Sequence, residues 1–177
     1  MHTILNHVSF KYPWFEISKI MPFSEKLKEK INKTVSQYET KQSALIPVLR
    51  EVQEEYGWLS KESMEEVAGL IGIPPASVQN VATFYTMFFT KPVGKRVIWL
   101  CRTLSCALRG AEQIEHYLSE KLKIHTGETT PDGKITLLEA ECLASCGTAP
   151  VALVDDELHE NLTRKKVDEL IDKLQRE

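Results

Sequence analysis

The four cysteines of this 177-residue chain fall into two close pairs. Cys101 and Cys106 lie in WLCRTLSCALRG, and Cys142 and Cys146 lie in EAECLASCGTAP, so the spacing is C-x4-C, 35 residues, and C-x3-C. Four thiolates can bind zinc in a closed tetrahedral site, or a [2Fe–2S] cluster in which each iron takes two cysteines. Thiol–disulfide exchange is the weakest of three possibilities, because the chain has no C-x2-C pair. The spacing alone leaves zinc and [2Fe–2S] nearly level.

Composition favours metal ligands over disulfides. The first 22 residues lack the uninterrupted apolar segment and the small-residue cleavage site of a signal peptide, so we expect a cytoplasmic chain with reduced thiols. No apolar run approaches the ~18 residues that a membrane helix needs, and we expect no direct membrane insertion. A net charge of −3 gives no electrostatic reason to expect nucleic-acid binding.

Each cysteine pair directly follows a predicted strand. The apolar run 96–101 ends at Cys101, and the run 135–142 ends at Cys142. Loops that leave one edge of a sheet can converge, and we expect these two to present the four thiolates to a shared site. A helix is predicted over 107–124, and Cys106 would open it, where free N–H groups and the helix dipole favour a thiolate. Gly147 is expected to form a tight turn in the second loop.

The rest of the C-terminal half completes a small α/β domain. Two short strands are predicted over 150–156 and 158–162, and a closing helix begins after Thr163 as N-cap. The order β-α-β-β-β-α suits a small sheet with helices packed against it. The segment TKPVGK, at 90–95, marks the boundary, so this domain is assigned to residues 93–177.

The N-terminal half has helical periodicity from Phe23 to about Phe89. We assign a helical domain to residues 23–92 and an N-terminal arm to residues 1–22. Ser24 and Ser60 are predicted N-caps, while Gly57 and Gly72 are predicted helix ends. The four predicted helices cover 24–38, 43–58, 60–72 and 74–89.

The chain resembles the thioredoxin-like [2Fe–2S] ferredoxins and, over roughly residues 23–176, the family of 24-kDa subunits of NADH:quinone oxidoreductase (respiratory complex I). All four cysteines match the ligand positions of that family. Arg102 departs from it, since the family often has a small or neutral residue there, and Ser145 stands where Ala is more usual. The matching stretches are VATFYTMF, CRTLSCALRGAE, HTGETTPDGKITLLEAECLASCGTAP and LTRKKVDELIDKL.

The resemblance implies an α+β chain, a helical segment followed by a thioredoxin-like α/β [2Fe–2S] domain. It implies an electron carrier with one [2Fe–2S] cluster, held by Cys101, Cys106, Cys142 and Cys146. The implied partners are a flavoprotein subunit that binds FMN and NADH and further peripheral-arm subunits, in a complex on the inner face of the membrane. The chain would then serve an NADH dehydrogenase without a substrate site or an acid–base catalyst of its own. It has no Gly-rich phosphate loop, which agrees with this expectation.

Two other functions stay open at this point. One is the equivalent diaphorase subunit of an NAD-linked hydrogenase or formate dehydrogenase, and the other is a zinc-stapled interaction module without a redox role. The aromatic residues between Phe84 and Phe89 either dock a flavoprotein or pack the helices onto the sheet domain; burial is the commoner fate of aromatic side chains. A solvated sheet edge, without chemistry, is expected for Glu139, Glu141, Asp155 and Asp156.

Overall fold

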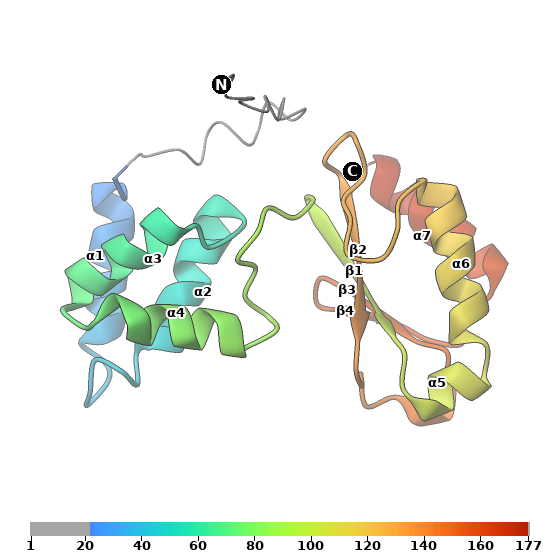
Figure 1. Cartoon of the computed structure of the whole chain (residues 1–177), viewed down its shortest axis with the longest axis horizontal. Helices are drawn as coiled ribbons and strands as arrows, with labels where there is room; N and C mark the ends of the chain where they lie inside the picture. Colours follow the sequence, from blue (N-terminus) through green and yellow to red (C-terminus); the bar gives the residue numbers. More distant parts are fainter. Residues whose placement is uncertain (1–21, 177) are drawn as a thin grey trace, which may run out of the picture. The chain divides into compact units, whose positions relative to one another are not determined.

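The computed structural model describes residues 22–176, so the predicted arm lies, apart from Pro22, outside the described residues. The chain separates into two compact units, the first ending at Pro92 and the second beginning at Val93 (Figure 1). Each unit has its own hydrophobic core.

The first unit is a group of four helices around one core. Its largest fully buried side chains include Ile31 of the first helix, Leu49 of the second and Val67 of the third. Within each helix the buried residues recur at helical spacing, as Leu45, Val48, Leu49 and Val52 do in the second, so one face is buried and the other lies in water. The helices are α1 (Glu25–Val35), α2 (Leu45–Tyr56), α3 (Lys61–Ile71) and α4 (Pro75–Phe84).

The predicted helix boundaries are confirmed at four places. Ser24 and Ser60 accept hydrogen bonds from the backbone N–H groups of Leu27 and Ser63, which satisfies donors that a helix start leaves unpaired. Gly57 and Gly72 end α2 and α3 in the left-handed conformation, at φ 79° and 68°.

Two predicted helices are too long. The first ends at Val35 rather than Tyr38, because the polar stretch after it offers no side chain to the core and Tyr38 is exposed, at 41%. The fourth ends at Phe84, because Tyr85 takes an extended conformation. That bend lets Phe88 enter the core of the helical unit and lets the Phe89 carbonyl accept from the Leu59 N–H at 2.7 Å.

The second unit is a sheet with helices on one of its faces. In Figure 1, α6 and α7 lie on the same side of the strands. The core between them includes Ile98 and Leu137 from the sheet, Leu118 from α6 and Val167 from α7. The elements are β1 (Arg96–Cys101), α5 (Leu104–Leu108), α6 (Ala111–Leu122), β2 (Ile135–Ala140), a 3-10 turn η2 (Cys146–Thr148), β3 (Ala152–Val154), β4 (Glu157–His159) and α7 (Arg164–Arg176).

The strand order in the described sheet is β2-β1-β3-β4. Strands β1 and β2 are parallel, while β3 runs antiparallel to both β1 and β4. The parallel register runs from Arg96 opposite Ile135 to Cys101 opposite Ala140, so both strands end level at one edge. Gly94 lies just before β1 and packs against the backbone of β2. A Cβ atom at this position would lie 2.9 Å from backbone atoms of Ile135, so there is room only for glycine. The expected α+β class is confirmed.

The predicted helix over 107–124 is two helices in the structure. Gly110 lies between α5 and α6 at φ 92°, a left-handed conformation that breaks the helical run and that glycine adopts without strain. Helix α5 begins at Leu104, so Cys106 is its third residue instead of its first. It still lies within the first turn.

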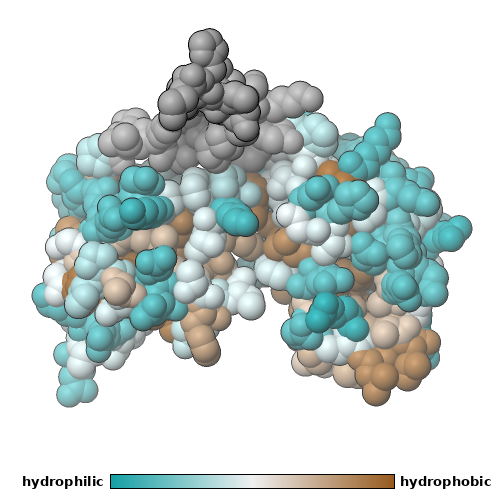
Figure 2. Space-filling view, in the orientation of Figure 1, coloured by the Kyte–Doolittle hydropathy of each residue, from teal (hydrophilic) through white to brown (hydrophobic). Residues whose placement is uncertain are grey.

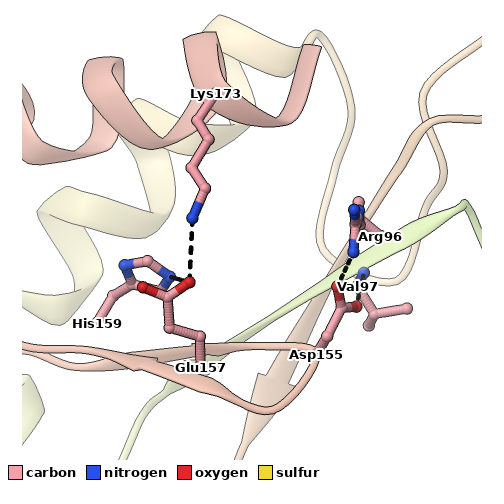
Figure 3. Close-up of polar contacts among 6 residues, drawn as sticks. All are labelled: Arg96, Val97, Asp155, Glu157, His159 and Lys173. Carbon is pink, nitrogen blue, oxygen red and sulfur yellow. Dashed lines mark hydrogen bonds and ion pairs between the residues drawn. The ribbon is translucent and has the colours of Figure 1, made fainter. Parts of the chain in front are cut away.

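Charged residues fasten the edge hairpin β3–β4 to the rest of the sheet unit (Figure 3). Asp155 accepts from the Arg96 guanidinium at 2.8 Å and from the Val97 N–H at 3.4 Å. Glu157 accepts from Lys173 of α7 at 3.1 Å and lies 3.9 Å from His159. The Lys173 hydrogen bond holds the pKa of Glu157 below its usual value. Asp155 was expected to be a solvated residue, and the structure shows that it forms an ion pair with Arg96.

No helix within the described residues 22–176 is both long enough and apolar enough to cross a bilayer.

We propose that the two units unfold separately, and two leucine variants test it. Leu49 lies in the helical core and Leu137 in the sheet core, and both are fully buried. Leu137→Ala is expected to lower the unfolding free energy of the sheet unit by about 2–5 kcal/mol. Native-state hydrogen exchange should then show weaker protection in β1 and β2 and unchanged protection in α2 and α3.

The matched variant Leu49→Ala should give the reverse pattern. Equal loss of protection in both units from either variant would show one cooperative unit and contradict the division.

Candidate metal centre

Cys101 ends β1 and is almost fully buried, at 2% exposure. Its Sγ lies 3.3 Å from Thr103 Oγ1 and 3.7 Å from the Glu141 carbonyl oxygen, which belongs to the loop after β2. The backbone N–H of Cys101 donates to the Val151 carbonyl at 3.1 Å. The first cysteine is therefore held between its own loop and the segment that carries the other pair.

Cys101 and Cys106 have opposite pKa shifts. Burial raises the pKa of the Cys101 thiol, but donors from Thr103, the Leu143 N–H and Cys106 outweigh burial and leave the pKa below its ordinary value. Burial also raises the pKa of Cys106, and its hydrogen bond with Cys101 adds to the rise, which the Val151 N–H only partly offsets. The pair shares one proton more easily than it loses two, as adjacent thiols do.

Cys142 and Cys146 are exposed. The turn between them depends on Ala144, which is left-handed at φ 57° and whose N–H points to Cys142 Sγ at 3.4 Å. The tight turn predicted at Gly147 is the 3-10 turn η2, in which Gly147 has no left-handed φ, so the left-handed residue of this loop is Ala144 and not the glycine. An alanine gives no sequence signal for such a conformation.

A carboxylate outside the cysteine loops holds the second loop, and no motif or spacing in the sequence indicated it. Glu160, just after β4, accepts hydrogen bonds from the hydroxyls of Ser145, at 2.6 Å, and Thr148. The Asn161 N–H also donates to the Thr148 carbonyl at 2.7 Å. Hydrogen bonds from Ser145 and Thr148 hold the pKa of Glu160 below its usual value, so the contact persists at neutral pH and is lost as pH falls through that lowered pKa.

The two cysteine loops meet at the edge where β1 and β2 end. Cys101 and Cys106 pack with Ala149, Val151 and Leu143 in one small apolar cluster. The charge of Cys146 also contributes to the raised pKa of Cys106, since the two loops lie close together. Among residues 22–176, no three or more His, Cys, Asp or Glu side chains gather closely enough to surround a single metal ion.

Arg102 is not a bare cation beside Cys101. Its guanidinium lies 3.2 Å from Glu139 and 3.1 Å from Glu141. Glu141 and then Glu139 raise the pKa of Arg102. The expected solvated carboxylates at the end of β2 thus form an ion-pair group that links the ends of the two parallel strands.

Two leucines on α5 make the surface beside Cys106 apolar. Leu104 and Leu108 are 74% and 78% exposed, one helical turn apart, while Cys106 between them is buried. Figure 2 shows this as a strongly hydrophobic patch at the lower right, where α5 lies in Figure 1.

The sequence matches the family model described as thioredoxin-like [2Fe–2S] ferredoxin over residues 31–175. The chain belongs to this family. This match confirms the family resemblance. The matched residues include parts of both compact units of the chain.

Two proteins that are similar in sequence are named as subunits of NADH-quinone oxidoreductase. NADH-quinone oxidoreductase subunit 2 of Thermus thermophilus is 42% identical over 154 residues, which cover 85% of each chain. A second NADH-quinone oxidoreductase protein, from Escherichia coli, is 36% identical over 146 residues, which cover 82% of this chain and 88% of that one. A crystal structure of NAD+-reducing [NiFe]-hydrogenase has a TM-score of 0.66 at 23% identity, over 75% of this chain and 23% of that chain. At that identity the likeness extends to the fold alone.

We predict that Glu160 orders the loop that carries Cys142 and Cys146. Glu160→Ala removes the acceptor of two hydroxyls, so the amides of residues 144–148 should exchange with deuterium faster. Glu160→Gln keeps an acceptor oxygen and should stay close to the parent protein. Glu157→Ala, on β4 but directed to Lys173, is the matched control and should leave this loop unchanged. Equal exchange in all four proteins would contradict the role of Glu160.

Proposed function

We propose that this chain is the electron-transfer subunit of an NADH:quinone oxidoreductase and that Cys101, Cys106, Cys142 and Cys146 hold one [2Fe–2S] cluster. One observation carries the proposal: the parallel pair β1 and β2 sends two cysteine pairs to one edge of the sheet, in a chain of the [2Fe–2S] ferredoxin family. The relatives at 36–42% identity, with which it shares most of its length, are subunits of that enzyme.

The donor set fits such a cluster. A single ion in a closed site needs three or four ligands around one point, whereas each iron of a [2Fe–2S] cluster needs two thiolates from the protein. Cys101 and Cys106 already hydrogen-bond to each other, which suits a pair that serves one iron. Cys142 and Cys146 are exposed, so their thiols are accessible to iron from outside the chain.

Backbone N–H groups close to the cysteines favour their thiolate forms. The Val151 N–H donates toward Cys106, and the Ala144 N–H donates to Cys142. Donors to sulfur offset the negative charge of a cluster with four thiolate ligands. When bound, the cluster accepts and returns one electron at a time, and the role of this chain is to hold it and to shield Cys101 and Cys106 from water.

The partner in this proposal is the flavoprotein subunit that binds FMN and NADH, beside further peripheral-arm subunits on the cytoplasmic face of the membrane. The chain carries no Gly-rich phosphate loop, so a nucleotide site elsewhere must supply the electrons. The apolar surface of Leu104 and Leu108 beside Cys106 suits a face that another subunit covers. The hydrogenase likeness rests on fold alone, whereas the quinone-oxidoreductase relatives match in sequence, and we favour the latter function.

We predict two irons and two acid-labile sulfides per chain in protein purified without air. Reduction with dithionite should give an S = 1/2 electron paramagnetic resonance signal, because antiferromagnetic coupling of one ferric and one ferrous iron leaves a net spin of one half. The double variant Cys142→Ser/Cys146→Ser should lose the signal. Stoichiometric zinc without sulfide would instead support the zinc-stapled interaction module.

We also predict that the isolated chain binds neither NADH nor FMN in calorimetry. NADH should bleach the visible absorption of the cluster once the flavoprotein partner is added, and not before. Dithionite serves as the control that the cluster remains reducible. Micromolar NADH binding by this chain alone would contradict the assignment of the nucleotide site to the partner.

A further inference from the structure

A hollow of about 470 Å³ lies beside Cys101, and charged side chains dominate its wall. We call it the acidic hollow. Among the described residues that line it, the charged ones are Arg102, Glu112, Glu115, Glu139 and Glu141. Four carboxylates against one guanidinium leave a formal charge of −3 at neutral pH, next to the residue proposed as the first ligand.

Three of the four carboxylates have polar contacts within the described residues. Glu139 and Glu141 lie at the end of β2 and pair with Arg102, at 3.2 and 3.1 Å. Glu115 of α6 accepts from the hydroxyls of Ser119 and Thr126, at 3.1 and 2.7 Å. These contacts restrain the three carboxylates and keep their charges near the end of β1.

Arg102 and Glu141 are charged residues that each directly adjoin a proposed ligand along the chain. Arg102 follows Cys101, and Glu141 precedes Cys142. The Arg102 N–H donates to the Ala140 carbonyl at 3.0 Å, and the Glu141 carbonyl faces Cys101 Sγ. A charge on either side chain therefore lies close to both cysteine loops.

We propose that the acidic hollow holds the reduction potential of the bound cluster low and that Arg102 is the counter-charge that limits this effect. The inference rests on the proposed function. Reduction adds one electron, and hence one negative charge, to a site that is already anionic. Each fixed carboxylate disfavours that step and the guanidinium favours it, since net charge is a principal determinant of cluster potential. The consequence is that Arg102, a departure from the usual family residue, is compensated by two carboxylates instead of acting alone.

The test is a redox titration with dithionite of protein purified without air. Electron paramagnetic resonance measures the reduced fraction at each potential. Glu139→Gln and Glu141→Gln each remove one negative charge at nearly constant shape, and each should raise the midpoint potential. Interactions between exposed charges are weak, so each variant should change the reduction equilibrium constant by about threefold. That corresponds to about 30 mV at ~59 mV per tenfold. Arg102→Gln should shift the potential in the opposite direction by a similar factor.

Three controls isolate the effect of charge. Arg102→Lys keeps the positive charge and should stay close to the parent potential. Glu169→Gln on α7 removes a carboxylate with a similar ion pair, to Lys165 at 3.9 Å, outside the hollow, and should change nothing. All shifts should shrink between about 0.1 and 1 M salt, because the Debye length falls from ~10 to ~3 Å.

The outcomes separate the two claims. Shifts in the stated directions support the inference. A cluster that is present in every variant with unchanged potentials, or with shifts of the opposite sign, overturns the inference and leaves the proposed function standing. Absence of a cluster from the parent protein overturns the proposed function and this inference with it. If Arg102→Gln is the one variant that fails to hold a cluster, the potentials of Glu139→Gln and Glu141→Gln still test the inference.

Discussion

The parallel pairing of β1 with β2 is the constraint on which the candidate site depends. Parallel strands point the same way, so their carboxyl ends lie at one edge, and a crossover must return the chain between them. Here α5 and α6 make that crossover, and α6 covers the apolar face of the strands. The register sets Cys101 opposite Ala140, two residues before Cys142. Because side chains alternate between faces, a slip of one residue would expose the core side chains, so burial of Ile98 and Leu137 fixes the register and hence the cysteine loops.

Charge is the second constraint at this edge. Burial of Cys101 and Cys106 opposes ionisation, and hydrogen-bond donors from both loops favour it. Several of the donors are backbone groups whose positions depend on turn geometry, such as the N–H of the left-handed Ala144. Glu160 and the group around Arg102 then add fixed negative charge beside the thiols. The fold thus has two opposing electrostatic effects at this edge. Local donors favour thiolates, and surrounding carboxylates disfavour further negative charge.

Much of this could be predicted from the sequence, because periodicity and capping are local properties. The strand that ends at Cys101, the apolar stripe of the last helix and the caps at Ser24 and Ser60 are all local signals, and the structure has them. The second strand, predicted over 135–142, ends two residues earlier, at Ala140. The break at Gly110 was missed because the apolar positions on both sides keep helical spacing. The roles of Ala144, Glu160 and the partners of Arg102 depend on contacts between residues far apart in sequence, or on a conformation that alanine does not announce. No composition or spacing argument reaches them.

The central claim is that the four cysteines at this edge bind two bridged irons, and X-ray absorption at the iron edge tests it most directly. Protein purified without air should show sulfur alone in the first shell of each iron and one iron neighbour at a single short distance, as a [2Fe–2S] cluster with four thiolate ligands requires. Nitrogen or oxygen neighbours in the first shell, or the lack of an iron–iron distance, would contradict it.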